Sequence, residues 1–139
     1  MNFKKNVIST LCLVSIVFAM FSTNVFAANP ATKSTPYGTL KGSITVGPGA
    51  FSTSKEITAT TTITKPAPYI SVSTSVVLYS TGATLGSGSD FGYNETIASD
   101  YIETNHFDSN SNAKMTAYGT HEIRDNSNSW VCYTAAVGI

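Results

Sequence analysis

The chain has 139 residues, and its eight basic and eight acidic side chains cancel to a formal net charge of zero. It has no basic cluster, which argues against a nucleic-acid partner, because phosphates require a positive surface. The same feature argues against binding to anionic membranes by charge alone. Serine and threonine provide most of the polarity, and such small or β-branched hydroxyl side chains suit the exposed faces of strands.

Segment 1–27 is predicted to be a secretory signal peptide that is cleaved. Lys4 and Lys5 precede an apolar run of about 15 residues, which is short of the roughly 20 that span a bilayer. Val25-Phe26-Ala27 then offers the small or aliphatic side chains that a signal peptidase reads, so cleavage is expected directly after it. We therefore expect a secreted or extracellular protein, either released or retained at the cell surface.

The rest of the chain is expected to form one domain at 37–139, preceded by a flexible leader at 28–36 that shows no periodicity. Apolar and polar residues alternate from Thr39 to Val46, which predicts a first strand that ends at the following Gly and Pro residues. Glu56 to Lys65 predicts a second strand with a face of four threonines. An ordinary solvated strand face explains this ladder better than a binding lattice does.

Ile70 to Tyr79 is the most regular stretch, and we expect it to be the central strand. Its residues alternate between one apolar and one serine-rich face, which indicates a strand that is buried on one side. The preceding Pro66-Ala67-Pro68 is expected to cross between sheets, since X-Pro bonds favour extended backbone. Thr81-Gly82 predicts a hairpin turn. Gly86 to Asp100 is expected to be an irregular polar loop that carries aromatic residues.

Three more strands are predicted at Tyr101–Phe107, Lys114–Arg124 and Trp130–Val137. The polar turn Asp125–Ser129 should join the last two as an antiparallel hairpin. About seven short strands separated by Gly, Pro and Asn turns predict an all-β fold. The expected architecture is a small single-domain antiparallel β-sandwich, with a small β-barrel as the alternative.

Metal-binding and acid–base patterns are weak. Asp108 to Asn112 resembles the opening of a calcium loop, but Ala113 stands where the loop requires glycine and Gly119 where it requires glutamate, which favours a plain turn. His106, Asp108 and His121 could form a metal or acid–base site, although no ligand spacing supports it. His121 shares a strand face with apolar residues, which favours a core histidine. No metal or cofactor is expected.

Nucleophilic and glycosidic catalysis also lack a motif. The sequence has no Gly-x-Ser-x-Gly elbow. Cys132, which would be the single cysteine after cleavage, lies within a predicted strand without the nearby positive charge that activates a thiol, and burial is the expected outcome. A glycosidase would need two carboxyls facing one cleft. Glu95, Asp100 and Glu103 are available, but the sequence does not place them together.

The tyrosines are the best candidates for a binding surface. Tyr79 and Tyr118 are predicted on the polar sides of their strands and Tyr93 in the long loop, where exposed rings can stack on sugars or anchor a protein partner. Cross-strand pairing that stabilises the sheet is the alternative role. The leading hypothesis is a non-enzymatic extracellular module that binds a cell-wall glycan or a surface protein.

Two other classes of function stay open at this point. The hydroxyl and aliphatic alternation at Glu56–Lys65 and Ile70–Tyr79 would also suit strands that refold into a membrane pore, as in a toxin or bacteriocin-like protein. Membrane contact is expected only under that hypothesis. A small secreted hydrolase is the third class.

Overall fold

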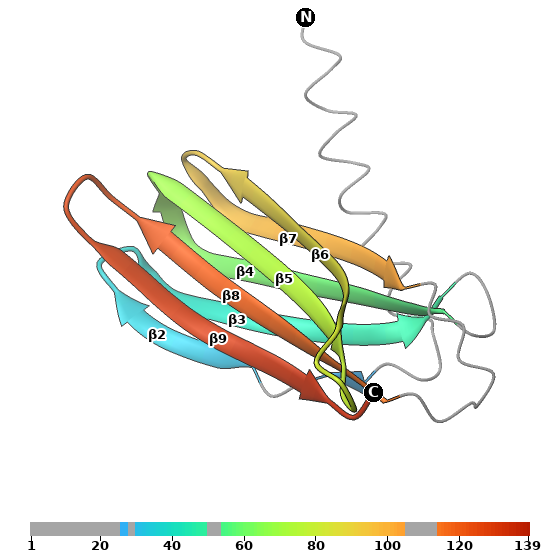
Figure 1. Cartoon of the computed structure of the whole chain (residues 1–139). Coiled ribbons are helices and arrows are strands. Elements are labelled where there is room, and N and C mark those ends of the chain that lie inside the picture. Colours follow the sequence, from blue (N-terminus) through green and yellow to red (C-terminus); the bar gives the residue numbers. More distant parts are fainter. Residues whose placement is uncertain (1–25, 28–29, 50–53, 105–113) are drawn as a thin grey trace, which may run out of the picture.

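A computed structural model describes residues 26–27, 30–49, 54–104 and 114–139 of the chain. These residues form nine β-strands in two antiparallel sheets that lie face to face (Figure 1). The sheets do not close on each other, so the predicted β-sandwich is confirmed and the barrel alternative is wrong. Within the described residues there is no helix long and apolar enough to cross a membrane.

The first sheet, which we call sheet A, has the strand order β1-β3-β4-β7, and β2 pairs with β3 as well. Its strands are β1 (Phe26–Ala27), β2 (Ala31–Thr35), β3 (Gly38–Pro48), β4 (Lys55–Ala67) and β7 (Glu95–Thr104). The second sheet, sheet B, has the order β6-β5-β8-β9. Its strands are β5 (Tyr69–Leu78), β6 (Thr84–Gly92), β8 (Met115–Arg124) and β9 (Ser129–Val137).

The strongest alternations in the sequence all coincide with strands. The predicted central strand is β5, which lies inside sheet B between β6 and β8 (Figure 1). Segment 66–68 carries the chain from β4 in sheet A to β5 in sheet B, as predicted. The turn at Thr81-Gly82 is also confirmed, because Gly82 has a φ of 71° and donates its N–H to the Leu78 carbonyl at 2.8 Å.

The predicted flexible leader at 28–36 is wrong for most of its length. Ala31–Thr35 form strand β2, which pairs with Gly38–Gly42 of β3 through a tight turn. The turn is supported by the Thr35 hydroxyl, which accepts the Tyr37 N–H at 3.1 Å. β2 shows no apolar periodicity because it is an edge strand held by backbone pairing, with its three central side chains exposed.

The predicted irregular loop at Gly86–Asp100 is also wrong. It forms most of β6 and the first part of β7, which therefore begins at Glu95 and not at the predicted Tyr101. Gly88 faces the interior, and a Cβ there would lie only 2.5 Å from the Asp100 carboxylate of β7. Glycines occupy inward positions of β6 because side chains of β7 fill the space, so the strand lacks the apolar face that usually reveals one.

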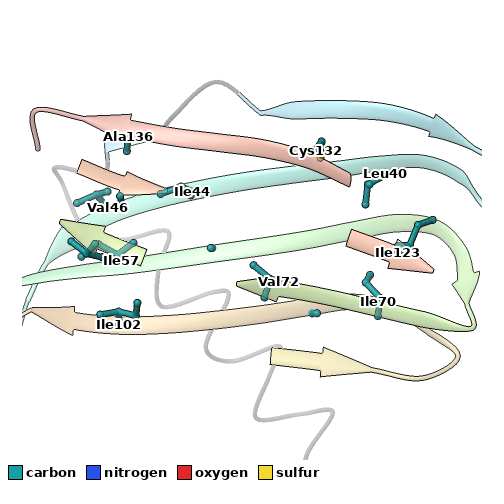
Figure 2. Close-up of a cluster of buried hydrophobic side chains, with 14 of the residues drawn as sticks. Leu40, Ile44, Val46, Ile57, Ile70, Val72, Ile102, Ile123, Cys132 and Ala136 are labelled. Atoms are coloured by element: carbon teal, nitrogen blue, oxygen red, sulfur yellow. The ribbon is translucent and has the colours of Figure 1, made fainter. Parts of the chain in front are cut away.

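The core lies between the sheets and consists of the inward-facing members of each alternation (Figure 2). Its largest fully buried apolar side chains are Leu40, Ile44, Ile57, Ile70, Val72, Val76 and Ile123. Burial of each such side chain stabilises the fold by about 1.5–3 kcal/mol. Cys132 is the single cysteine of the described residues and is a buried thiol, so apolar contacts stabilise this sandwich without a disulfide between described residues.

Candidate functional site

Three aromatic side chains gather at one end of the outer face of sheet B, and we call them the aromatic cluster. Tyr69 opens β5, Phe91 lies near the end of β6, and Tyr93 follows in the β6–β7 turn. The Tyr69 and Phe91 rings stack with centroids 6.1 Å apart and planes at 19°, while Tyr93 meets them edge-on at 5.6 and 5.9 Å. Phe91 is 59% exposed and Tyr93 is 65% exposed, so the cluster presents accessible ring surface to solvent.

Arg124 holds the cluster in place from β8. Its guanidinium carbon lies 4.1 Å from the Tyr69 ring centroid, because the two residues are cross-strand neighbours in the β5–β8 register. The Arg124 Nε lies 3.4 Å from Glu122 Oε1, and that oxygen also accepts the Ser129 hydroxyl at 2.6 Å. These contacts fix the side of the cluster that faces β8, and the rings of Phe91 and Tyr93 stay exposed.

Small hydroxyl side chains extend from the cluster along sheet B, and we call them the hydroxyl stripe. The stripe consists of Ser71, Ser73, Ser75, Ser87, Ser89 and Thr120, which lie side by side on β6, β5 and β8. Tyr118 and Tyr133 stand beside it on β8 and β9 and are both exposed. The outer face of sheet B therefore carries short hydroxyl side chains on β6, β5 and β8, with longer aromatic side chains beside them.

The three tyrosines predicted as a binding surface are all exposed, but the structure does not bring all of them together. Tyr93 belongs to the aromatic cluster. Tyr118 borders the hydroxyl stripe opposite Ser75, further along the same face. Tyr79 lies beyond the other end of β5, where its N–H donates to the Lys114 carbonyl at 2.8 Å. The three tyrosines are therefore spread along the length of β5, from Tyr93 at one end past Tyr118 to Tyr79 at the other.

Tyr69, Phe91 and Arg124 are not among the residues that the sequence predicts as a binding surface. The contact between Tyr69 and Arg124 depends on the register of β5 against β8, which neither strand shows alone. Phe91 is missed because its strand was expected to be a loop. The period-two alternation of Gly and Ser from Gly86 to Ser89 is the signal that could have revealed this strand and the outward direction of Phe91.

A second aromatic contact at the same end of the sandwich connects the β2–β3 turn to the β8–β9 turn. The Tyr37 ring meets Trp130 edge-on at 6.1 Å, and its hydroxyl donates to Asp125 Oδ2 at 3.4 Å. Burial and the neighbouring carboxylate raise the pKa of Tyr37. Backbone N–H groups of the turn, led by Ser127 at 2.8 Å, lower the pKa of Asp125. This contact braces the end that carries the aromatic cluster.

His121 lies inside the sandwich and takes no part in a surface site. It is fully buried, and its Nδ1 and Nε2 lie 2.9 Å from Thr61 Oγ1 and 2.7 Å from Thr134 Oγ1. Thr61 donates its single hydroxyl proton to the Ser71 carbonyl at 2.9 Å, so His121 must donate from Nδ1 and accept from Thr134 at Nε2. Burial lowers the pKa of His121 to about 4, so the ring is neutral at pH 7.

Two carboxylates face each other on the outer face of sheet A. Glu56 of β4 and Glu103 of β7 are direct cross-strand partners, which places their Cβ atoms about 5 Å apart. Tyr101 hydrogen bonds to Glu56, and partial burial with this bond raises the pKa of Tyr101 to about 12. Ser54 donates to Glu103 Oε1 at 3.0 Å. The pair lies on the sheet opposite to the aromatic cluster.

In the described part of the chain, the other candidate residues for catalysis or metal binding do not come together in one site. Cys132 is buried, its thiol points to the Ala31 carbonyl at 3.8 Å, and burial raises its pKa. Glu95 and Asp100 lie on β7, Glu95 exposed and Asp100 buried. His106 and the Asp108–Asn112 segment lie outside the described residues. Within the ranges that the structure describes, no three His, Cys, Asp or Glu side chains are placed to hold a metal ion together.

Comparisons with protein-family models, with curated proteins and with solved structures found no match to this chain.

Proposed function

We propose that the protein is a non-enzymatic binding module that recognises a glycan on the outer face of sheet B. The aromatic cluster carries this proposal, because the rings of Phe91 and Tyr93 are exposed and yet pack against Tyr69, which Arg124 contacts in turn. Ring faces can stack on the apolar faces of sugar rings. Side chains that are ordered before binding lose little conformational entropy when the ligand arrives.

The hydroxyl stripe adds the polar half of such a site. A glycan lying across the cluster would extend over Ser71 and Ser73, which are short enough to let a sugar ring approach the sheet. Serine and threonine hydroxyls both donate and accept hydrogen bonds, as sugar hydroxyls do. Tyr133 on β9 and Tyr118 on β8 supply further rings along the same face. The combination suits an extended neutral polysaccharide better than a charged ligand.

The geometry favours binding over hydrolysis. The carboxylates of Glu56 and Glu103 lie on the outer face of sheet A, whereas the aromatic cluster lies on the outer face of sheet B. A sugar bound to the cluster would be separated from these carboxylates by the whole thickness of the sandwich, roughly 10 Å from sheet to sheet. Asp100 faces the interior, so it cannot serve a surface ligand either.

Co-sedimentation of the purified protein with isolated cell walls and with insoluble polysaccharides tests the proposal. We expect the protein to pellet with one of these, and we expect Phe91→Ala and Tyr93→Ala each to weaken binding by roughly tenfold, since each removes a stacking surface. Tyr101→Ala is the matched control, because it removes a tyrosine that is 54% exposed on the opposite sheet.

Three outcomes would contradict the proposal. The first is pelleting that is unchanged in both cluster variants, and the second is an equal loss in Tyr101→Ala. The third is pelleting with liposomes and not with walls or polysaccharides, especially with leakage of an enclosed dye. That last result would instead support the membrane-active class of function.

A further inference from the structure

Asp100 is a buried carboxylate that the proposed function does not use. It lies on β7, is only 8% exposed, and points between the sheets. Its Oδ2 is fully enclosed and accepts no hydrogen bond from any described residue. In the described part of the chain the only ion pair joins Arg124 to Glu122, so no basic side chain there neutralises Asp100.

A second orphaned oxygen lies across the interior from this carboxylate. Thr74 of β5 is 1% exposed, and its Oγ1 has no hydrogen-bond partner among the described residues. Thr74 is the cross-strand partner of Gly88, and a Cβ at Gly88 would lie 2.5 and 2.7 Å from the Asp100 carboxylate oxygens. Because cross-strand Cβ positions lie about 5 Å apart, the Thr74 side chain lies within roughly 8 Å of the carboxylate.

A second acidic side chain lies at the edge beside this pair. Asp90 of β6 reaches across to β7, where its Oδ2 accepts the Ser99 N–H at 3.0 Å. Ser99 directly precedes Asp100, so Asp90 brings another negative charge to the place where β6 and β7 meet. The Asp90 side chain is exposed.

We propose that a calcium ion binds at the β6–β7 edge, with Asp100 and Thr74 as its inner ligands and Asp90 at its outer side. An unpaired carboxylate inside a protein is unfavourable, and a bridging water would satisfy the hydrogen bonds without compensating the charge. Calcium accepts carboxylate, hydroxyl and water oxygens in irregular arrangements of six to eight ligands. Magnesium requires shorter bonds and a nearly ideal octahedral arrangement, whereas calcium tolerates ligands that come from three different strands.

Thermal unfolding and calorimetric titration of the purified full chain, stripped with EDTA, test the site. We expect about 10 mM CaCl2 to raise Tm by about 5 °C, as for an extracellular site of millimolar affinity, and MgCl2 to have a much smaller effect. Asp100→Asn should lose the calcium response. Thr74→Val, which keeps the side-chain shape, should bind calcium several-fold more weakly. Asp125→Asn is the control, because it removes a carboxylate at a distant turn.

The responses of the wild type and the variants to calcium and magnesium decide whether the site exists. A wild-type Tm that does not change with calcium, together with no heat of binding, would overturn the proposal. An equal calcium response in wild type and Asp100→Asn would also overturn it, because the ion would then bind elsewhere. An equal response to magnesium would overturn the assignment of calcium. If Asp100→Asn does not fold, a Thr74→Val response equal to that of the wild type is sufficient to reject the site.

Discussion

Acid should destabilise this protein well above the pH at which its carboxylates titrate, and His121 is the reason. The ring is enclosed between the sheets and is neutral, with Thr61 and Thr134 as its hydrogen-bond partners. Protonation would place a positive charge where no described acidic side chain contacts the ring. The folded protein therefore resists protonation, whereas the unfolded chain accepts a proton at the ordinary pKa of 6.5.

The size of the effect follows from the two pKa values. The folded pKa is about 4 and the unfolded pKa is 6.5, so between these values only the unfolded state binds the proton. The free energy of unfolding then falls by up to about 1.4 kcal/mol per pH unit as the pH decreases, and by about 3 kcal/mol in all. Above pH 6.5 the contribution is constant. For a domain of this size, a loss of 3 kcal/mol is a large fraction of the total stability.

Urea unfolding between pH 7.5 and about 4.5, followed by the fluorescence of Trp130, measures this directly. Trp130 is the single tryptophan of the chain, and it is half-buried beside Tyr37. His106→Gln is the matched control and should keep the full pH dependence. His121→Gln should flatten it. A wild-type stability that stays constant over this range, or a pH dependence that disappears in His106→Gln, would refute the reasoning.

Three further predictions concern stability and can be checked by urea unfolding. Gly42→Ala should lower the free energy of unfolding by at least about 2 kcal/mol, because the new Cβ would collide with the enclosed ring of His121. Gly82→Ala should lower it by only about 1 kcal/mol, because its Cβ meets no other atom and only the positive φ opposes the change. Equal losses in the two variants would contradict this reasoning. Ile70→Ala should cost about 3 kcal/mol and Ile70→Val about 1 kcal/mol, and the absence of this gradient would show that the site is not tightly packed. Asp125→Ala should destabilise the protein at pH 7, and the difference from wild type should shrink as the pH falls below the ordinary carboxyl pKa of 3.8, because the folded pKa is lower; a difference that persists at pH 2 would argue against a role for the charge.

Much of the fold could be predicted because most strands bury one face and expose the other. In β5 the inward positions from Ile70 to Val76 carry Ile, Val and Thr without interruption, and the outward positions carry Ser. The same rule predicts that His121 faces inward with Ile123, and the structure confirms its burial. Its partners Thr61 and Thr134 could not be predicted, since they come from other strands and other registers.

Alternation of apolar and polar residues does not reveal a strand where side chains from only one sheet fill the interior. β6 has glycine at Gly86 and Gly88 because Ile102 and Asp100 of β7 occupy the space beneath it. Its inward face therefore carries no hydrophobic signal, and the strand reads as a loop. β2 is missed for a different reason, since an edge strand that is held by backbone hydrogen bonds needs no buried face.

The candidate site could be predicted only in part, because exposure and proximity have different origins. Exposure follows from alternation within one strand, so the exposure of Tyr79 and Tyr118 could be predicted, whereas Tyr93 is a candidate only through its expected place in a loop. Proximity depends on how β5, β6 and β8 align with one another, and this alignment brings Tyr69 against Arg124 and Phe91. Periodicity decides which face of a strand is buried, but it does not distinguish alignments of two strands that differ by two residues.

The buried histidine also restricts how this sequence can evolve. Gly42 and Gly119 leave no room for a Cβ against the His121 ring, and Thr61 and Thr134 each satisfy one of its nitrogens. Loss of the histidine alone would remove the acceptor of the Thr134 hydroxyl, and gain of a side chain at either glycine would displace the ring. In proteins descended from a common ancestor with this one, substitutions at the five positions should therefore occur together, and any one of them alone should be rare.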